Sequence, residues 1–229
     1  MRVFCARSMQ AAVTALAAEP VAAADIVFEP MGVLKARLAG GETADVFVLA
    51  AAAIDALVAA GAVVAGSRTA IASAAIGVAV RAAVAAPPGI ATANAFAAAL
   101  KGARAIALSD PAVGGSAGVY LRDLFDRIGL AETVAAKTLY RHSGAAAGDA
   151  VGRGEADLAL TFIPELMQAR GVRILGPLPP PHAHATVYVA AVATHSPLQE
   201  RAHAFIAALT GVGAAPAWTA AGFDPAPAD

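Results

Sequence analysis

Short apolar runs that alternate with helix-like stretches constrain the fold of this chain more than any other feature. In its first part, strands are predicted at residues 2–6, 25–28 and 45–49, and helices at 9–18, 33–39 and 52–60. Successive strands that are separated by helices pair side by side through crossover connections. The alternation therefore predicts an α/β protein with a mostly parallel sheet.

The same pattern returns after the double proline Pro87-Pro88. Strands are predicted there at residues 105–109, 137–140 and 157–161, and helices at 93–100, 119–128 and 146–153. Two further runs of β-type residues, 76–80 and 186–192, stand at breaks in composition and are candidate hinge strands. The proline-rich segment 176–181 cannot be helical and is expected to be extended.

These elements predict two lobes, each a mostly parallel sheet flanked by helices, joined by two hinge strands. The chain ends in a helix predicted at 200–209 and a tail around Trp218 and Phe223. We expect that tail to pack back on the first lobe, which makes the first lobe discontinuous. The predicted boundaries are 1–80 and 186–229 for the first lobe, and 81–185 for the second.

Composition excludes several functional classes. Of the 229 residues, 59% are hydrophobic and 14% are charged, which is typical of a globular chain with a large core. The formal net charge of -1 provides no field that would attract nucleic acid. Membrane insertion is not expected either, because Asp55 lies near the middle of the most apolar segment, residues 46–66.

The beginning of the sequence bears on where such a protein would act. Met1 is followed directly by the first predicted strand, without the apolar segment and cleavage site of a signal peptide. We therefore expect a cytoplasmic protein if the chain as given is complete, and a periplasmic one if a signal peptide was removed. The single Cys5 forms no intramolecular disulfide and does not indicate a compartment.

Two strand-to-helix junctions carry the chemistry that the sequence suggests. One is Cys5-Ala6-Arg7-Ser8-Met9 and the other is the loop 110–118, and each has a serine before a predicted helix. The first N–H groups of a helix have no intrahelical partner and carry partial positive charge, so two such ends could bind an anion. The alternative is that Ser8 and Ser116 only cap their helices.

The order of these parts resembles the molybdate-binding proteins, a family of type II periplasmic solute-binding proteins. The resemblance spans nearly the whole chain and rests on Ala6-Arg7-Ser8, on residues 34–46, on Asp110-Pro111 with 115–120, and on 154–159. It implies a small anion held between the lobes. The ligand residues that it and the neighbouring loops suggest are Arg7, Ser8, Met9, Gly32, Val33, Ser116, Ala117, Arg141, Ser143, Gly144 and Phe162.

Two of these positions depart from the family pattern. Where molybdate binders usually have a second hydroxyl-bearing loop, Gly32 and Val33 offer only backbone N–H groups, and Phe162 stands at a position usually held by tyrosine. Arg7 adds a guanidinium, which suits a carboxylate. The ligand is therefore expected to be an organic carboxylate or a molybdate-like oxyanion. An alternative for Arg7 is an ion pair with Glu29.

The resemblance implies a binding protein, a monomer that delivers its ligand to an ABC-type permease, with no cofactor and no metal. The five histidines have no ligand spacing for a metal ion. The alternative is an enzyme like aconitate isomerase, which is similar to the same family; its base could be Glu29 or His142, beside Arg7 and Arg141. A hydrolase is disfavoured, because the G-x-S-x-G pattern at 114–118 does not directly follow a strand.

Overall fold

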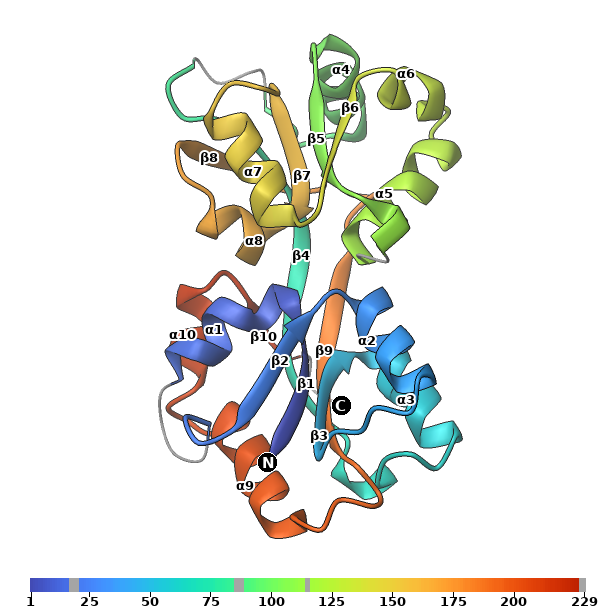
Figure 1. The fold of residues 1–229 in the computed structure, drawn as a ribbon. Helices are drawn as coiled ribbons and strands as arrows, with labels where there is room; N and C mark the ends of the chain where they lie inside the picture. Colours follow the sequence, from blue (N-terminus) through green and yellow to red (C-terminus); the bar gives the residue numbers. More distant parts are fainter. Residues whose placement is uncertain (17–20, 85–88, 114–115, 227–229) are drawn as a thin grey trace. The chain divides into compact units, whose positions relative to one another are not determined.

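The computed structural model describes residues 1–16, 21–84, 89–113 and 116–226, and it is a mixed α/β protein (Figure 1). The end of the helix predicted at 9–18, the double proline Pro87-Pro88 and the pair Gly114-Gly115 lie outside the described residues. The chain forms two compact units. Unit 1 comprises Met1–Ala74 and Thr186–Asp229, and unit 2 comprises Ala75–Ala185.

The sheet of unit 1 is built on three parallel strands. Strand β1 (Arg2–Ala6) pairs in parallel with β2 (Asp25–Glu29) on one side and β3 (Val46–Ala50) on the other. Strand β9 (Ala185–Val192) then pairs antiparallel with β3. The carboxyl ends of β1, β2 and β3 therefore lie at one edge of this sheet.

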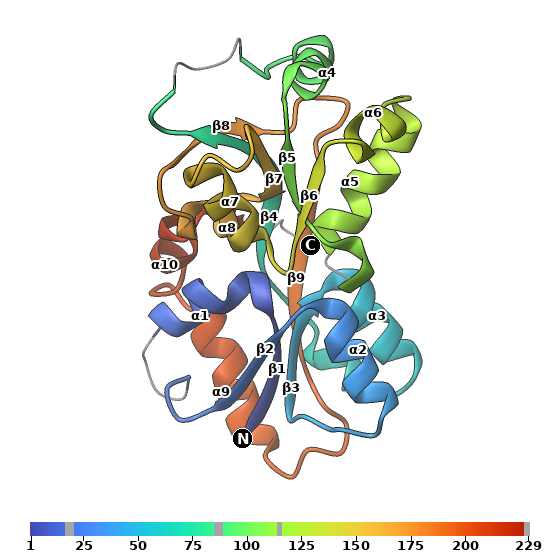
Figure 2. The ribbon, with the colours of Figure 1, turned by 45° about the horizontal axis from the view of Figure 1, so that its top comes forward.

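Helices cover both faces of the unit 1 sheet (Figures 1 and 2). They and the short helical turns are η1 (Arg7–Met9), α1 (Gln10–Ala15), α2 (Met31–Ala39), α3 (Ala51–Ala59), η2 (Ala65–Ser67), α9 (Gln199–Thr210) and α10 (Ala215–Ala220). One core forms where α2 and α3 pack on the sheet, around Phe4, Leu34 and Ile54, all of which are fully buried. The apolar strand residues thus specify a sheet that is buried on both faces.

The C-terminal segment packs within unit 1. Strand β10 (Asp224–Pro225) pairs antiparallel with β4 (Thr69–Arg81) at Ser73 and Ala72. The Trp218 Nε1–H donates a hydrogen bond to the Leu209 carbonyl, and the Phe223 ring makes edge-to-face contacts with Trp218 and Tyr188. An aromatic cluster therefore holds the end of the chain against the unit.

Unit 2 repeats the scheme with a second sheet. Strand β5 (Ile106–Ser109) pairs in parallel with β6 (Thr138–Arg141) and with β7 (Leu158–Phe162). The second half of β4 pairs antiparallel with β7 and with β8 (Val172–Pro177). The carboxyl ends of β5, β6 and β7 again share one edge.

Alanine dominates the part of the unit 2 core that lies under α7. Its helices and turns are α4 (Ala93–Gly102), η3 (Pro111–Val113), α5 (Ser116–Arg127), α6 (Ala131–Ala135), α7 (Gly144–Gly152) and α8 (Ile163–Gln168). Ala147, Ala150 and Val151 on α7 pack on Ala107 and Ala159 of the sheet. Such small side chains let the helix approach the strands closely. None of the helices in the described part of the chain has the length and apolar character that a membrane span requires.

A histidine stacked on a tyrosine makes the stability of unit 2 depend on pH. The rings of Tyr120 and His184 are stacked with centroids 4.0 Å apart, and the Arg127 guanidinium lies over the Tyr120 ring. Burial, with a contribution from the Arg127 charge, lowers the pKa of His184. On acidification the unfolded chain therefore binds a proton at this site before the folded chain does, and stability falls with it.

We expect the free energy of unfolding of the wild type to fall as the pH is lowered through the ordinary histidine pKa of about 6.5. His184→Phe keeps an aromatic ring against Tyr120 but cannot bind a proton, so it should reduce this pH dependence. Urea unfolding of both proteins at pH 5 and pH 8, followed by circular dichroism, measures the difference. An equal pH dependence in both proteins would contradict the assignment.

Candidate functional site

Most of the residues suggested by the sequence lie at the carboxyl ends of parallel strands. In unit 1, Arg7, Ser8 and Met9 follow β1, and Gly32 and Val33 follow β2. In unit 2, the suggested residues 116–117, 141–144 and 162 lie at or after the ends of β5, β6 and β7. Open α/β sheets bind ligands at this edge.

The Ser8 hydroxyl of unit 1 does not cap a helix. It lies 2.6 Å from the Tyr188 hydroxyl, a residue of β9, and both side chains are buried. The turn η1 begins at Arg7 and has no side-chain cap, and α1 has only six residues. The capping interpretation of Ser8 is therefore wrong, and so short a helix gives no anion site of its own. Ser8 instead forms part of a buried hydroxyl pair beside the fully buried Met9.

Arg7 forms an ion pair with Glu29, the alternative that the sequence left open. Its Nη2 lies 2.7 Å from Glu29 Oε2, and Arg37 Nη2 lies 3.6 Å from Glu29 Oε1. The pairing follows from the sheet register, which places Ala6 opposite Glu29. The Nε of Arg7 is buried and has no hydrogen-bond partner among the residues that the structure describes.

Helix α2 provides the backbone donors of unit 1. Pro30 precedes the helix, and Gly32 and Val33 are its second and third residues. The first hydrogen bond at this end runs from Leu34 N to the Pro30 carbonyl. The N–H groups of Gly32 and Val33 therefore have no intrahelical acceptor. Both residues are half-buried.

In unit 2, helix α5 begins at Ser116 and packs closely on the end of β5. A side chain at Gly118 would overlap with the Ser109 carbonyl, so the approach requires glycine. Ser116 is half-buried and Ala117 is buried. The Ser109 Oγ at the end of β5 is buried and has no hydrogen-bond partner among the described residues. In this it resembles the Arg7 Nε, which follows β1.

The suggested residues at and after the end of β6 divide into two groups. Ser143 caps α7, since its Oγ accepts a hydrogen bond from Ala146 N at 3.2 Å, and Gly144 is the buried first residue of that helix. Arg141 instead donates to Glu155, at 2.7 Å. Hydrogen bonds from Arg153 and Arg141 lower the pKa of Glu155 to about 2. Of these three suggested residues, Ser143 and Gly144 form part of the strand-end surface, whereas Arg141 is held by an ion pair.

The structure adds an acidic residue that the sequence analysis missed. The Thr161 hydroxyl, fully buried in β7, donates a 2.5 Å hydrogen bond to Oε2 of Glu165 in α8. A Cβ atom on Gly144 would overlap with both of these side chains. The Glu165 carboxylate thus lies directly against the first residue of α7. Phe162, the last residue of β7, is buried next to Thr161.

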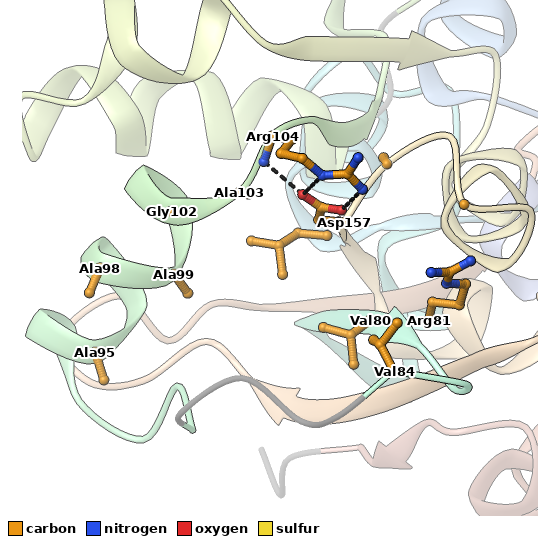
Figure 3. Close-up of a pocket in the computed structure, with 13 residues that line it drawn as sticks. Val80, Arg81, Val84, Ala95, Ala98, Ala99, Gly102, Ala103, Arg104 and Asp157 are labelled. Atoms are coloured by element: carbon orange, nitrogen blue, oxygen red, sulfur yellow. Dashed lines mark hydrogen bonds and ion pairs between the residues drawn. The ribbon is translucent and has the colours of Figure 1, made fainter.

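A cavity of about 480 Å³ lies elsewhere in unit 2. Figure 3 shows its walls, formed by small side chains of α4, by the end of β4, and by the paired Arg104 and Asp157. Asp157 accepts hydrogen bonds from the backbone N and the side chain of Arg104, which lowers its pKa. None of the residues suggested as ligands lines this cavity. Its charged pair is already satisfied, so we do not place the ligand there.

Among the described residues, no group of three or more histidine, cysteine or acidic side chains is arranged to hold a metal ion. Cys5 is fully buried in β1, and burial raises the pKa of its thiol. It is therefore protonated and unsuited to nucleophilic chemistry.

Known proteins are similar to this chain in sequence and in fold. A family model described as bacterial extracellular solute-binding protein matches residues 1–224. An aconitate isomerase from a Pseudomonas species is 35% identical over 209 residues, which cover 91% of this chain and 78% of that protein.

Solved structures show the same fold at low identity. The periplasmic molybdate-binding protein of Azotobacter vinelandii superposes with a TM-score of 0.75 at 22% identity, covering 97% of this chain and 98% of that one. The sulfate-binding protein of Mycobacterium tuberculosis H37Rv gives 0.71 at 18% identity, covering 98% and 86%.

Proposed function

This chain belongs to the family of bacterial extracellular solute-binding proteins, and we propose that it binds a small organic carboxylate with the strand-end surfaces of both units. Backbone N–H groups and hydroxyls would provide most of the hydrogen bonds, and Arg7 a charged one. As in a hinged binding protein, ligand binding would favour the conformation in which both surfaces contact the ligand.

Buried donors at two strand ends carry this proposal. Arg7 Nε follows β1 and Ser109 Oγ ends β5, and neither has a partner within the described part of the chain. A third such atom, Arg2 Nε, belongs to the opposite end of β1. A buried polar atom without a partner is unfavourable, so ligand oxygens at the first two positions would restore their hydrogen bonds.

A carboxylate suits these surfaces better than molybdate does. Gly32 and Phe162 provide no hydroxyl, so two donors expected for a molybdate site are missing. Arg7 pairs with Glu29 through Nη2 alone, and the planar guanidinium has further donors for a second carboxylate. The relative named aconitate isomerase acts, by its name, on a carboxylate, and this supports the same class of ligand for this chain.

A thermal-shift screen tests this proposal. The panel contains di- and tricarboxylates, molybdate, tungstate, sulfate and phosphate, and a bound ligand raises the unfolding temperature. We expect the largest shift with a carboxylate. Arg7→Ala should weaken its binding by roughly tenfold to a hundredfold, because a charge-assisted hydrogen bond contributes about 1.5–3 kcal/mol.

Arg68→Ala is the matched control, because Arg68 pairs with Asp55 on α3 and should not affect binding. Stabilisation by molybdate alone would mean that the ligand is an oxyanion and not an organic carboxylate. Unchanged carboxylate binding in Arg7→Ala would remove Arg7 from the site.

Isomerisation of a tricarboxylate is a second candidate function, favoured by 35% identity over 91% of the chain to aconitate isomerase. Glu29, one of the bases suggested by the sequence, is held by Arg7 and Arg37, and His142 is exposed. Glu165 adds a third candidate base, which also lies at a strand end. Incubating the protein with cis-aconitate and following the trans isomer by NMR tests this function. Binding of aconitate without conversion would rule out the isomerase function and keep the binding function.

A further inference from the structure

The cavity of about 480 Å³ in unit 2 is separate from the surface proposed to bind the ligand. Its walls include Arg104 and Asp157, which precede β5 and β7, and Leu158, the first residue of β7. These residues lie at the amino ends of the parallel strands, whereas the ligand residues suggested for unit 2 lie at the carboxyl ends. A compound bound in the cavity would therefore occupy a second site.

The size and the walls of the cavity suit a small apolar molecule. Pockets that bind small organic molecules measure about 300–1,000 Å³, and this cavity falls within that range. Apolar side chains from the end of β4, from α4 and from the start of β7 line it, and they include Val80, Val84, Ala95, Ala99, Ala156 and Leu158. Covering them removes apolar surface from water, which would provide most of the binding free energy.

The charged side chains of the wall leave one positive charge uncompensated. Asp157 is paired with Arg104, because it accepts hydrogen bonds from Arg104 Nη2 at 2.6 Å and from the Arg104 backbone N at 2.7 Å. The Arg81 side chain forms no hydrogen bond or ion pair with another residue in the described part of the chain. In Figure 3 its guanidinium lies apart from the Arg104–Asp157 pair.

The position of the Arg81 guanidinium is fixed by a second residue of the wall. A Cβ atom on Gly154 would lie 3.0 Å from Arg81 Nη1, so the charged group lies directly against Gly154. A planar guanidinium presents several N–H donors to a carboxylate. The wall therefore combines an apolar surface with one cation that can receive an acidic group.

Charged groups around the cavity do not reverse this sign. Glu155, which follows Gly154, accepts hydrogen bonds from Arg141 at 2.7 Å and from Arg153 at 2.6 Å. Arg173 of β8 donates to the carbonyl of the wall residue Val84 at 3.4 Å. The acidic group is thus already paired with two cations, and a further cation adjoins the wall. These surroundings favour an anion over a cation.

We propose that this cavity is a second binding site, which takes a small amphipathic acid with an apolar body and a single carboxylate. The apolar body covers the alanine, valine and leucine side chains, and the carboxylate lies beside Arg81. Because Arg81 is exposed, its charge selects acids but contributes little of the affinity. A di- or tricarboxylate is disfavoured, since it would place a second charge against apolar walls. The inference does not depend on the proposed function, because the two sites share no residue.

Octanoate and octan-1-ol are a matched pair of probes, because they have unbranched chains of the same length and only octanoate is charged at pH 8. Calorimetric titration gives their affinities, and amide chemical shifts of ¹⁵N-labelled protein locate the site. We expect both probes to bind the wild type and to shift amides of α4 and of the start of β7. Octanoate should bind about threefold more tightly than octan-1-ol, and added salt should reduce this difference.

Ala99→Leu tests the apolar wall. The larger side chain on α4 fills part of the cavity and should weaken the binding of both probes by at least about tenfold. Ala204→Leu is the matched control, because Ala204 is an exposed residue of α9 in unit 1. It should bind both probes as the wild type does. Circular dichroism of each variant checks that the fold is retained.

Arg81→Gln tests the charge without filling the cavity. It should lower the affinity for octanoate about threefold, to that for octan-1-ol, and leave the affinity for octan-1-ol unchanged. Arg122→Gln makes the same charge change on α5, where Arg122 is exposed and pairs with Asp123. This control should keep the preference for octanoate, because Arg122 does not line the cavity.

Each part of the proposal has an outcome that would overturn it. Equal affinities for the two probes, unchanged in Arg81→Gln, would overturn the selection of acids. Unchanged binding to Ala99→Leu, or amide shifts at the starts of α2 and α7 and not at α4, would show that the cavity is not the site. Absence of binding of both probes to the wild type would overturn the second site altogether.

Discussion

Gly144→Ala is expected to weaken carboxylate binding by at least about tenfold and to destabilise the protein by about 1–3 kcal/mol. The substitution adds a Cβ atom where the Thr161 hydroxyl and the Glu165 carboxylate now lie. Thr161 is fully buried, so the overlap must be relieved by a shift of these side chains or of the start of α7. Alanine has a higher helix propensity than glycine, so propensity alone would make Gly144→Ala stabilising. A loss of stability would therefore come from the steric overlap.

Gly102→Ala is the control for this experiment. Gly102 ends α4, and a Cβ atom there would meet no other atom within 4 Å. It should leave both binding and stability nearly unchanged. Calorimetric titration and urea unfolding of the two variants provide the comparison. Binding by Gly144→Ala at the wild-type affinity would show that the ligand does not use this surface.

Phe4→Ala should lower the free energy of unfolding of unit 1 by about 3–5 kcal/mol, the largest effect on stability that we expect. Phe4 is fully buried in β1, and its ring makes an edge-to-face contact with Phe47 at a centroid distance of 6.1 Å. Its removal leaves a cavity between the sheet and the helices α2 and α3. Such a loss is a large share of the stability of a typical domain.

The single tryptophan of the chain makes this prediction specific to one unit. Trp218 lies in α10 and is buried in unit 1, so its fluorescence reports on the unfolding of that unit. Val212→Ala is a matched control in the same unit, because Val212 is 97% exposed and its truncation should change stability by less than about 0.5 kcal/mol. An equal transition midpoint for Phe4→Ala and wild type would contradict the packing described for Phe4.

The sequence pattern predicted most of the elements of the fold. The strand expected at 2–6 is β1, and the other strands that pair in parallel agree within one residue at each end. The comparisons confirm the type II periplasmic binding protein fold. Apolar runs between helices carry this information, because a strand that is buried on both faces must be apolar throughout.

Elements that do not follow the apolar pattern were missed. Strand β4 extends over Thr69–Arg81, whereas the sequence predicted only residues 76–80, because alanine and serine have weak strand propensity and long-range pairing overrides it. Helix α8 has six residues, and its only signals are Pro164 at its start and Glu165 in its first turn. Strand β8 was also missed.

Local sequence suggested which loops form the candidate surfaces, but not the partners of each side chain. The ion pair of Arg7 with Glu29 was one of two alternatives, and sheet register decides between them. Ser8 was interpreted as a possible cap, whereas it pairs with Tyr188, 180 residues away in the sequence. The position of Glu165 against Gly144 depends on how α7 and α8 pack, which spacing in one sequence does not determine.

The measurement that tests the account most directly is the number of carboxylate sites per chain and their dependence on both units. We would titrate the best carboxylate of the screen into wild type, Ser8→Ala and Gly144→Ala, which alter unit 1 and unit 2 respectively. The account predicts one site per chain, weakened by either substitution. A site that only one of the two substitutions affects, or two independent sites, would contradict the claim that both units bind one ligand.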